Sequence, residues 1–150
     1  MIARAVLAAL ALAGAAAPAQ ARRGECAFTA VQVVERFSQL FFIEKKPREA
    51  FMAWVAPDYI QHNPMATDGR DAAIAALEPV FAANPDLKVD IKRIFGDESL
   101  VAVHYHSTMK AGEPGYAAVD MFRVVDCRIV EHWDVIQPMP TQSANPHPIF

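Results

Sequence analysis

The stretch from residue 117 to residue 137 constrains the fold of this chain more than any other. Two runs rich in β-branched and aromatic residues flank a polar break at Asp126-Cys127, a pattern typical of a β-hairpin. A two-residue loop would need a positive φ at both loop positions, which suits a cysteine poorly. A three-residue loop, from Val125 to Cys127, needs only one left-handed residue, and this is the loop that we predict.

The loop length sets the register of the hairpin, and the register decides which side chains share a face. With the three-residue loop, Asp120 pairs with His132 and Ala118 pairs with Asp134. One face then carries Asp120, His132 and Asp134 beside the apolar Phe122. The other face carries Val119, Met121, Ile129, Trp133 and Val135. A register slipped by one residue would place Asp120 opposite Trp133 and separate the polar cluster.

The sequence before residue 87 predicts helices. A capping-box pattern at Thr29 and Gln32 begins a predicted helix at 30–42. A second helix is predicted at 47–55, with proline at its first position, and a third at 70–83, capped by Thr67 or Asp68. The segment 58–64 between these two is predicted to be extended or a loop, because a proline follows Asn63.

After residue 85 the apolar spacing changes from helical to alternating. Strands are predicted at 87–95 and 100–108, followed by the two strands of the hairpin and an irregular, proline-rich tail. Helices followed by strands favour an α+β domain, in which three helices pack on one face of a curved sheet of four or more antiparallel strands.

Residues 1–21 have the features of an export signal. Arg4 supplies a basic start, 5–17 is an alanine- and leucine-rich run, and Ala19-Gln20-Ala21 is an A-x-A cleavage pattern. The run is too short and too rich in alanine to span a bilayer comfortably. We therefore predict one mature domain at 22–150, periplasmic or secreted, with no membrane association after cleavage.

The predicted export bears on the redox state of the two cysteines of the chain, Cys26 and Cys127. In an oxidising compartment a lone pair of cysteines is more often bonded than free. We predict a Cys26–Cys127 disulfide that ties the start of the mature domain to the hairpin tip.

Composition and motifs exclude several classes of function. The formal net charge is −3 and no basic cluster occurs, which argues against nucleic acid as a partner. The chain has no G-x-S-x-G motif and no glycine-rich phosphate loop, which argues against nucleophilic catalysis and nucleotide binding.

The histidines suggest where a pocket could lie. His104 and His106 share one face of the strand at 100–108, while Val101, Val103 and Tyr105 share the other. If the polar faces of neighbouring strands coincide, one concavity holds five polar side chains and is walled by Phe122, Phe41 and Trp54. The five are His104, His106, Asp120, His132 and Asp134.

The chemistry of such a concavity has three interpretations. An aspartate in an apolar pocket has a raised pKa and can exchange protons near neutral pH. The same pattern also describes the solvated face of a one-sided sheet. Histidines and acids would suit zinc or iron, but no local spacing such as H-x-x-x-H supports a metal site, and we predict neither metal nor cofactor.

Four segments resemble the SnoaL-like polyketide-cyclase group of the nuclear-transport-factor-2-like superfamily. They are YIQHNP at 59–64, DMFR at 120–123, IVEHWDVIQ at 129–137 and ANPHPIF at 144–150. The resemblance implies a cone in which helices pack against a strongly bent antiparallel sheet, forming a barrel that encloses a pocket. It also implies an inward-pointing Asp120, and homodimers formed through the outer sheet face.

In ketosteroid isomerase the acid that corresponds to Asp120 donates a hydrogen bond to an enolate, and in the cyclases it is the acid/base of an aldol ring closure. The chain departs from the group in two ways. Cys127 stands where a glycine is expected at the hairpin tip, and the chain carries an export signal although polyketide cyclisation is cytoplasmic.

Together these observations predict a cofactor-free acid/base enzyme (an isomerase, aldol-type cyclase or hydrolase) that acts on a small carbonyl or aromatic compound. The predicted catalytic residues are Asp120, His132, His106 and Asp134. The predicted ligand-binding residues are Tyr59, His62, His104, Phe122, Trp54 and Phe41. Two alternatives remain: a binding module for a small ligand without chemistry, and a dimeric domain whose histidines are ordinary core groups.

Overall fold

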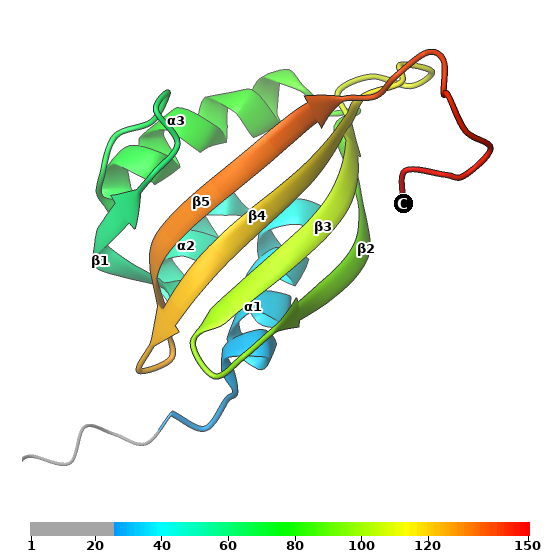
Figure 1. Ribbon diagram of the computed structural model, residues 1–150. Coiled ribbons are helices and arrows are strands. Elements are labelled where there is room, and N and C mark those ends of the chain that lie inside the picture. Colours follow the sequence, from blue (N-terminus) through cyan, green and yellow to red (C-terminus); the bar gives the residue numbers. More distant parts are fainter. Residues whose placement is uncertain (1–25) are drawn as a thin grey trace, which may run out of the picture.

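The computed structural model describes residues 26–150, which form a five-stranded sheet. The helices lie on one face of this sheet (Figure 1). The helices are α1 (Ala30–Ser38), the π-helical turn η1 (Gln39–Ile43), α2 (Pro47–Trp54) and α3 (Arg70–Ala83). The strands are β1 (Val55–Gln61), β2 (Lys88–Gly96), β3 (Leu100–Thr108), β4 (Tyr116–Val125) and β5 (Arg128–Pro138). The predicted signal sequence at 1–21 lies outside the described residues.

The sheet has the strand order β1-β5-β4-β3-β2, and its strands bend around the helices (Figure 1). The predicted α+β class is confirmed, with two differences: the sheet is mixed, and it is not closed into a barrel. The difference in strand direction comes from β1, which we predicted as an extended or loop segment and which pairs in parallel with β5. Gln61 lies opposite His132 in that pairing.

The helices begin largely where predicted. Thr29 and Gln32 form the predicted capping box, with the Gln32 N–H 3.2 Å from Thr29 Oγ1 and the Thr29 N–H 3.0 Å from Gln32 Oε1. The predicted caps of α3 are wrong. Gly69 is the N-cap residue, with a φ of 98°, and the Asp68 carboxylate instead accepts a hydrogen bond from the Gln61 N–H at 2.8 Å. Asp68 therefore anchors the loop after β1.

The hairpin has a different loop and a different register from those predicted. Asp126 and Cys127 form a two-residue loop with φ values of 48° and 63°, as a type I′ turn requires. A β-bulge then adds Val130 as an extra residue, so the pairing passes from Val124↔Ile129 to Arg123↔Glu131.

The shorter loop and the bulge together explain which parts of the predicted register fail. Asp120 lies opposite Asp134 instead of His132, and Ala118 lies opposite Ile136. Because the total shift is two residues, Asp120, His132 and Asp134 still share one face. Ile129, predicted on the outer face, is fully buried because the two-residue loop pairs it with the buried Val124.

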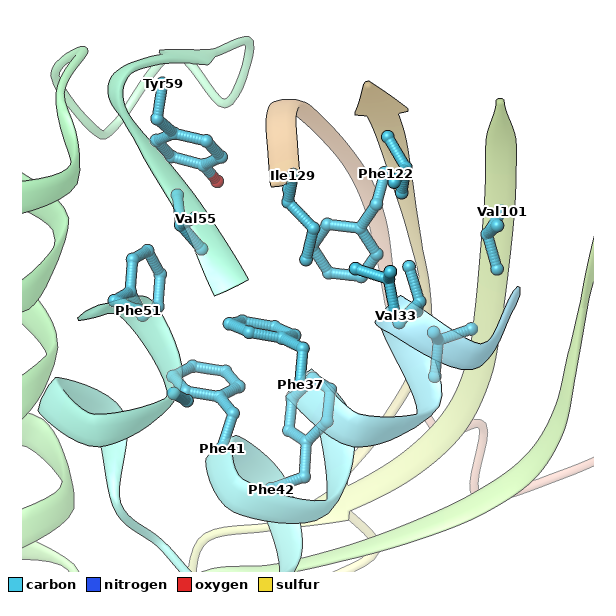
Figure 2. Close-up of a cluster of buried hydrophobic side chains, with 14 of the residues drawn as sticks. Val33, Phe37, Phe41, Phe42, Phe51, Val55, Tyr59, Val101, Phe122 and Ile129 are labelled. Atoms are coloured by element: carbon cyan, nitrogen blue, oxygen red, sulfur yellow. The ribbon is translucent and has the colours of Figure 1, made fainter. Parts of the chain in front are cut away.

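Aromatic rings from the helices fill the space against the sheet. The Phe37 ring centroid lies 5.4 Å from that of Phe51 and 5.4 Å from that of Phe122 on β4 (Figure 2). Val101 and Val103 of β3 point into the same core and are fully buried. The helices therefore cover the sheet face that carries Val101, Phe122 and Asp120.

The predicted disulfide between Cys26 and Cys127 is present, with the two Cα atoms 5.3 Å apart. It joins the segment before α1 to the β4–β5 turn. Among residues 26–150, no helix combines the length and the apolar character needed to cross a bilayer.

Candidate functional site

A cavity of about 340 Å³ lies between the sheet and the helices. Its walls are mainly apolar, with rings from Phe37, Phe41, Phe42, Phe51 and Phe122 and small side chains from α3. Its polar groups come from β1, the loop after β1, β3, β4 and β5. They are Tyr59, Gln61, Asn63, Tyr105, Asp120, His132 and Asp134. An apolar cavity with a few convergent polar groups is the usual form of a small-molecule site.

Asp120 is the most deeply placed acid of the cavity, with only 6% of its surface exposed. Its Oδ1 accepts a hydrogen bond from the Tyr105 hydroxyl at 3.2 Å and lies 3.6 Å from His132 Nε2. Burial raises the pKa of Asp120, the interaction with His132 partly offsets this, and the negative charge of Asp134 adds to it. The net pKa is raised, so Asp120 can hold a proton above the usual range of a carboxyl group.

Gln61 fixes the orientation and the tautomer of His132. The Asn63 backbone N–H can only donate, and it lies 3.0 Å from Gln61 Oε1, which identifies that atom as the amide oxygen. His132 Nδ1 lies 2.9 Å from the same oxygen and must therefore be the protonated nitrogen. The lone pair of neutral His132 then lies on Nε2, facing Asp120. A proton held by Asp120 can therefore be shared with His132 Nε2, 3.6 Å from Asp120 Oδ1.

Asn63 holds Asp134 in the same way. The side-chain oxygen of Asn63 accepts a hydrogen bond from the Met65 backbone N–H at 2.8 Å. The amide nitrogen of Asn63 is therefore the atom that donates to Asp134 Oδ2, at 2.7 Å. Asp134 thus faces the cavity with one oxygen held by a neutral amide.

These contacts show how the segments at 59–64 and 131–134 form one unit. Parallel pairing of β1 with β5 places Gln61 beside His132, and the His62 N–H donates to the His132 carbonyl at 2.9 Å. Gln61 and Asn63 point inward to their partners, whereas His62 points outward and stacks on Trp133, with ring centroids 4.5 Å apart. The alternation of both segments therefore produces an inner polar cluster and an outer aromatic stack.

Tyr59 brings a hydroxyl group to the same end of the cavity. The Gln61 side-chain amide donates to this hydroxyl at 3.3 Å. Burial, with the nearby charges of Asp120 and Asp134, raises the pKa of Tyr59, so the group keeps its proton at neutral pH. Among residues 26–150 the structure shows no acceptor for that proton, which leaves it available to an oxygen atom of a ligand.

Three side chains could together hold a divalent cation. Asp120, His132 and Asp134 each offer a ligand atom, and these atoms lie within 4.8 Å of one another. The His132 Nδ1–H donated to Gln61 is the kind of outer contact that orients a metal-binding imidazole. A cation and the shared Asp120–His132 proton would compete for the same atoms.

The structure brings six of the predicted site residues together around the cavity: Phe41, Tyr59, Asp120, Phe122, His132 and Asp134. It places four elsewhere, and we correct those predictions. His104 and His106 lie on the outer face, because the helices cover the apolar face of β3, and both rings contact Phe150 at 5.2 Å. His62 lies in the outer stack described above. Trp54 packs edge-on against Phe28, with centroids 5.8 Å apart.

Three polar residues of the described cavity lining were missed from the sequence: Gln61, Asn63 and Tyr105. The alternation of Tyr59, Gln61 and Asn63 could have indicated a strand with one polar, inward face. Tyr105 was assigned to the outer face together with its apolar neighbours.

Residues 34–132 match the family model of the SnoaL-like domain. The chain belongs to the SnoaL-like domain family. No match is found among proteins with a curated function. The SnoaL-like fold is also evident from solved structures, which share 15–22% identity in the three cases described next and therefore support the fold alone.

A protein from Kribbella flavida is 22% identical, with a TM-score of 0.61, over 73% of this chain and 87% of its own. A protein from Jannaschia sp. CCS1, assigned to the SnoaL-like polyketide cyclases, is 20% identical, with a TM-score of 0.57, over 74% and 93%. An NTF2-like protein of unknown function from Cytophaga hutchinsonii is 15% identical, with a TM-score of 0.59, over 74% of this chain and 93% of its own.

Proposed function

We propose that this SnoaL-like protein is an exported, cofactor-free acid/base enzyme that acts on a small carbonyl or aromatic compound in the cavity. The observation that carries the proposal is Asp120. It is a buried carboxyl group with a raised pKa at the polar end of an aromatic cavity, beside a histidine of defined tautomer. Titratable groups perturbed in this way, in a cavity, are typical of acid/base sites.

Asp120 has an oxygen atom available for proton transfer. Its Oδ1 is engaged by Tyr105 and His132, whereas Oδ2 makes no hydrogen bond within residues 26–150. Ser38 Oγ is the one side-chain polar atom in that range that is both fully enclosed and without a partner, so Oδ2 is not sealed off. Because Asp120 lines the cavity, we infer that Oδ2 is reached through it.

In the proposed reaction the Asp120 carboxylate removes a proton from the carbon next to a ligand carbonyl. The electron pair of that C–H bond forms a C=C bond, the π pair of the carbonyl moves to its oxygen, and the Tyr59 hydroxyl donates a hydrogen bond to the resulting enolate. Return of the proton to another carbon gives an isomerase. Attack of the enolate carbon on a second carbonyl gives an aldol-type ring closure, in which Asp120 returns its proton to the new alkoxide. His132 positions Asp120 and balances its charge.

The test measures proton exchange, and so it does not require the natural substrate. Cyclic and aryl ketones are incubated in D₂O, and deuterium incorporation next to the carbonyl is followed by NMR. Asp120→Asn should lower the enzyme-catalysed exchange by about 10²- to 10⁴-fold. His132→Gln should also lower it, whereas His104→Gln, a matched change on the outer sheet face, should not. Unchanged exchange in Asp120→Asn would remove Asp120 from the mechanism.

The alternative is a module that binds a small ligand without chemistry. The mostly phenylalanine-lined wall favours it, because such a wall holds an aromatic ligand by burial alone. A ligand that raises the thermal midpoint, without exchange or product in any ketone tested, would support this alternative.

Two further proposals concern location and assembly. The Cys26–Cys127 disulfide supports a periplasmic or secreted location, because such bonds persist in oxidising compartments. The outer sheet face is the proposed homodimer surface, and Val135 there is 63% exposed. Sedimentation velocity should show a dimer that Val135→Glu converts to monomer.

A further inference from the structure

The cavity has an unbalanced negative charge at Asp134. One oxygen of this carboxylate accepts from the neutral Asn63 amide, and within residues 26–150 neither oxygen forms an ion pair with a lysine or arginine. No lysine or arginine is among the described residues that line the cavity. Asp134 therefore brings a negative charge to the cavity that no lysine or arginine of the described lining offsets.

The neighbouring acid shows that Asp134 is unusual here. Glu131 lies three residues earlier on β5, on the outer face, and its carboxylate is 2.5 Å from the Arg123 guanidinium. Asp134 has no such partner, although it lies beside an aromatic wall where an uncompensated charge is costly. The buried Asp120 adds a second acidic oxygen, Oδ2, that also lacks a protein partner.

We infer that the cavity selects ligands that carry a protonated amine on an aromatic body of about two fused rings. The ammonium group binds the Asp134 carboxylate, and the rings pack on Phe37, Phe41 and Phe122. Ligands with a carboxylate in the place of the amine are rejected. This inference rests on the proposed function in that it names the ligand class of the same cavity.

Physical chemistry supports each part of this selection. The ammonium would make a charge-assisted hydrogen bond with a carboxylate in a partly dry site, which contributes more than a neutral hydrogen bond. The faces of nearby aromatic rings attract cations as well. An anionic ligand would meet like charge with no basic group to offset it.

The experiment compares three ligands that differ only in one group: 2-naphthylmethylamine, 2-naphthalenemethanol and 2-naphthoate. Their dissociation constants are measured by titration calorimetry at pH 7.5 with wild type, Asp134→Asn and Asp58→Asn. Asp58→Asn removes the same charge from an exposed position of β1 that does not line the cavity. In the wild type the amine should bind roughly tenfold or more tighter than the alcohol, and the naphthoate should be the weakest.

In Asp134→Asn the advantage of the amine over the alcohol should disappear, while the affinity for the alcohol stays within about twofold. Asp58→Asn should retain the wild-type order. Equal affinities for amine and alcohol in the wild type, an unchanged preference in Asp134→Asn, or no binding by any of the three compounds would overturn the inference. These outcomes are independent of the deuterium-exchange test of Asp120, so failure of the ligand class is distinguishable from failure of the proposed chemistry.

Discussion

Removal of the Cys26–Cys127 disulfide tests how much of the stability of this fold comes from one crosslink. The two cysteines are 101 residues apart in the sequence, so the bond closes almost the whole domain into a loop. The chain-entropy relation for a loop of this length gives a stabilisation of about 4.7 kcal/mol at 25 °C. Domains of this size unfold with a free energy of about 5–15 kcal/mol, so the crosslink would account for a large share of the total.

The variant is Cys26→Ser/Cys127→Ser, in which neither position keeps a reactive thiol. Unfolding in urea is followed by tryptophan fluorescence, since Trp54 and Trp133 lie on different elements. We expect the free energy of unfolding to fall by about 4.7 kcal/mol relative to the oxidised protein, and reduced wild type to resemble the variant. Cavity ligands should still bind to the folded fraction of the variant, because the loop-closure effect acts on the unfolded chain.

Two results would refute this reasoning. A loss of less than about 1 kcal/mol would mean that the loop-closure estimate does not apply to this chain. A loss of ligand affinity in the folded variant would mean that the bond shapes the native state and not only the unfolded one.

Three predictions concern the polar end of the cavity. Burial gives Asp120 a pKa that is higher in the folded protein than its unfolded value of about 3.9, so wild type should lose stability as pH rises from about 4 through the folded pKa. The difference in thermal midpoint between wild type and Asp120→Asn should therefore depend on pH, and a constant difference would contradict the raised pKa. Tyr105→Phe removes a hydrogen bond that favours the Asp120 carboxylate, so the pKa of Asp120 should rise further. The acidic limb of the pH profile of the exchange rate should then move to higher pH, and a shift to lower pH would contradict this role of Tyr105. Dialysis against EDTA should leave exchange unchanged, whereas added Zn²⁺ should inhibit by displacing the proton shared by Asp120 and His132; a loss of exchange in EDTA would make the site metal-dependent.

The sequence predicted the contents of the cavity better than it predicted the pairing that assembles them. The real loop is one residue shorter than the predicted loop, and the bulge at Val130 adds one residue to β5. Each change moves the pairing by one position in the same direction. Together they return His132 and Asp134 to the same face as Asp120, as predicted. Neither could be predicted readily, because Cys127 is an unfavourable residue for a left-handed turn position and a bulge leaves no strong pattern.

Polarity alone could not identify the face of β3 that lines the cavity. We assumed that the histidines of β3 point in the same direction as Asp120. The pairing of Val103 with Asp120 instead places the apolar side of β3 inward and leaves His104 and His106 outside. A binding cavity is itself largely apolar, so the polar face of a strand is often the solvated one.

Strand β1 was missed for a different reason. Its partner, β5, follows about seventy residues later, with Gln61 and His132 separated by 71 positions, and a parallel neighbour at that distance leaves no local signal. Prolines at both ends of the segment also favoured a loop. The same pairing brings the amides of Gln61 and Asn63 to the cavity, so both residues were missed together with the strand.

The dependence of the site on this edge pairing leads to a prediction about a residue outside the cavity. The stack of His62 on Trp133 lies on the outer face, directly behind the contact between Gln61 and His132. His62→Ala should therefore lower the free energy of unfolding by about 1 kcal/mol and slow deuterium exchange, because the β1 edge holds the His132 tautomer less firmly. Ile60→Ala is the matched control, since Ile60 lies on β1 two residues before His62, is 42% exposed and makes no ring stack. Equal effects of the two substitutions on exchange would show that the outer stack does not support the inner cluster, and that Gln61 is positioned by the backbone of β1 alone.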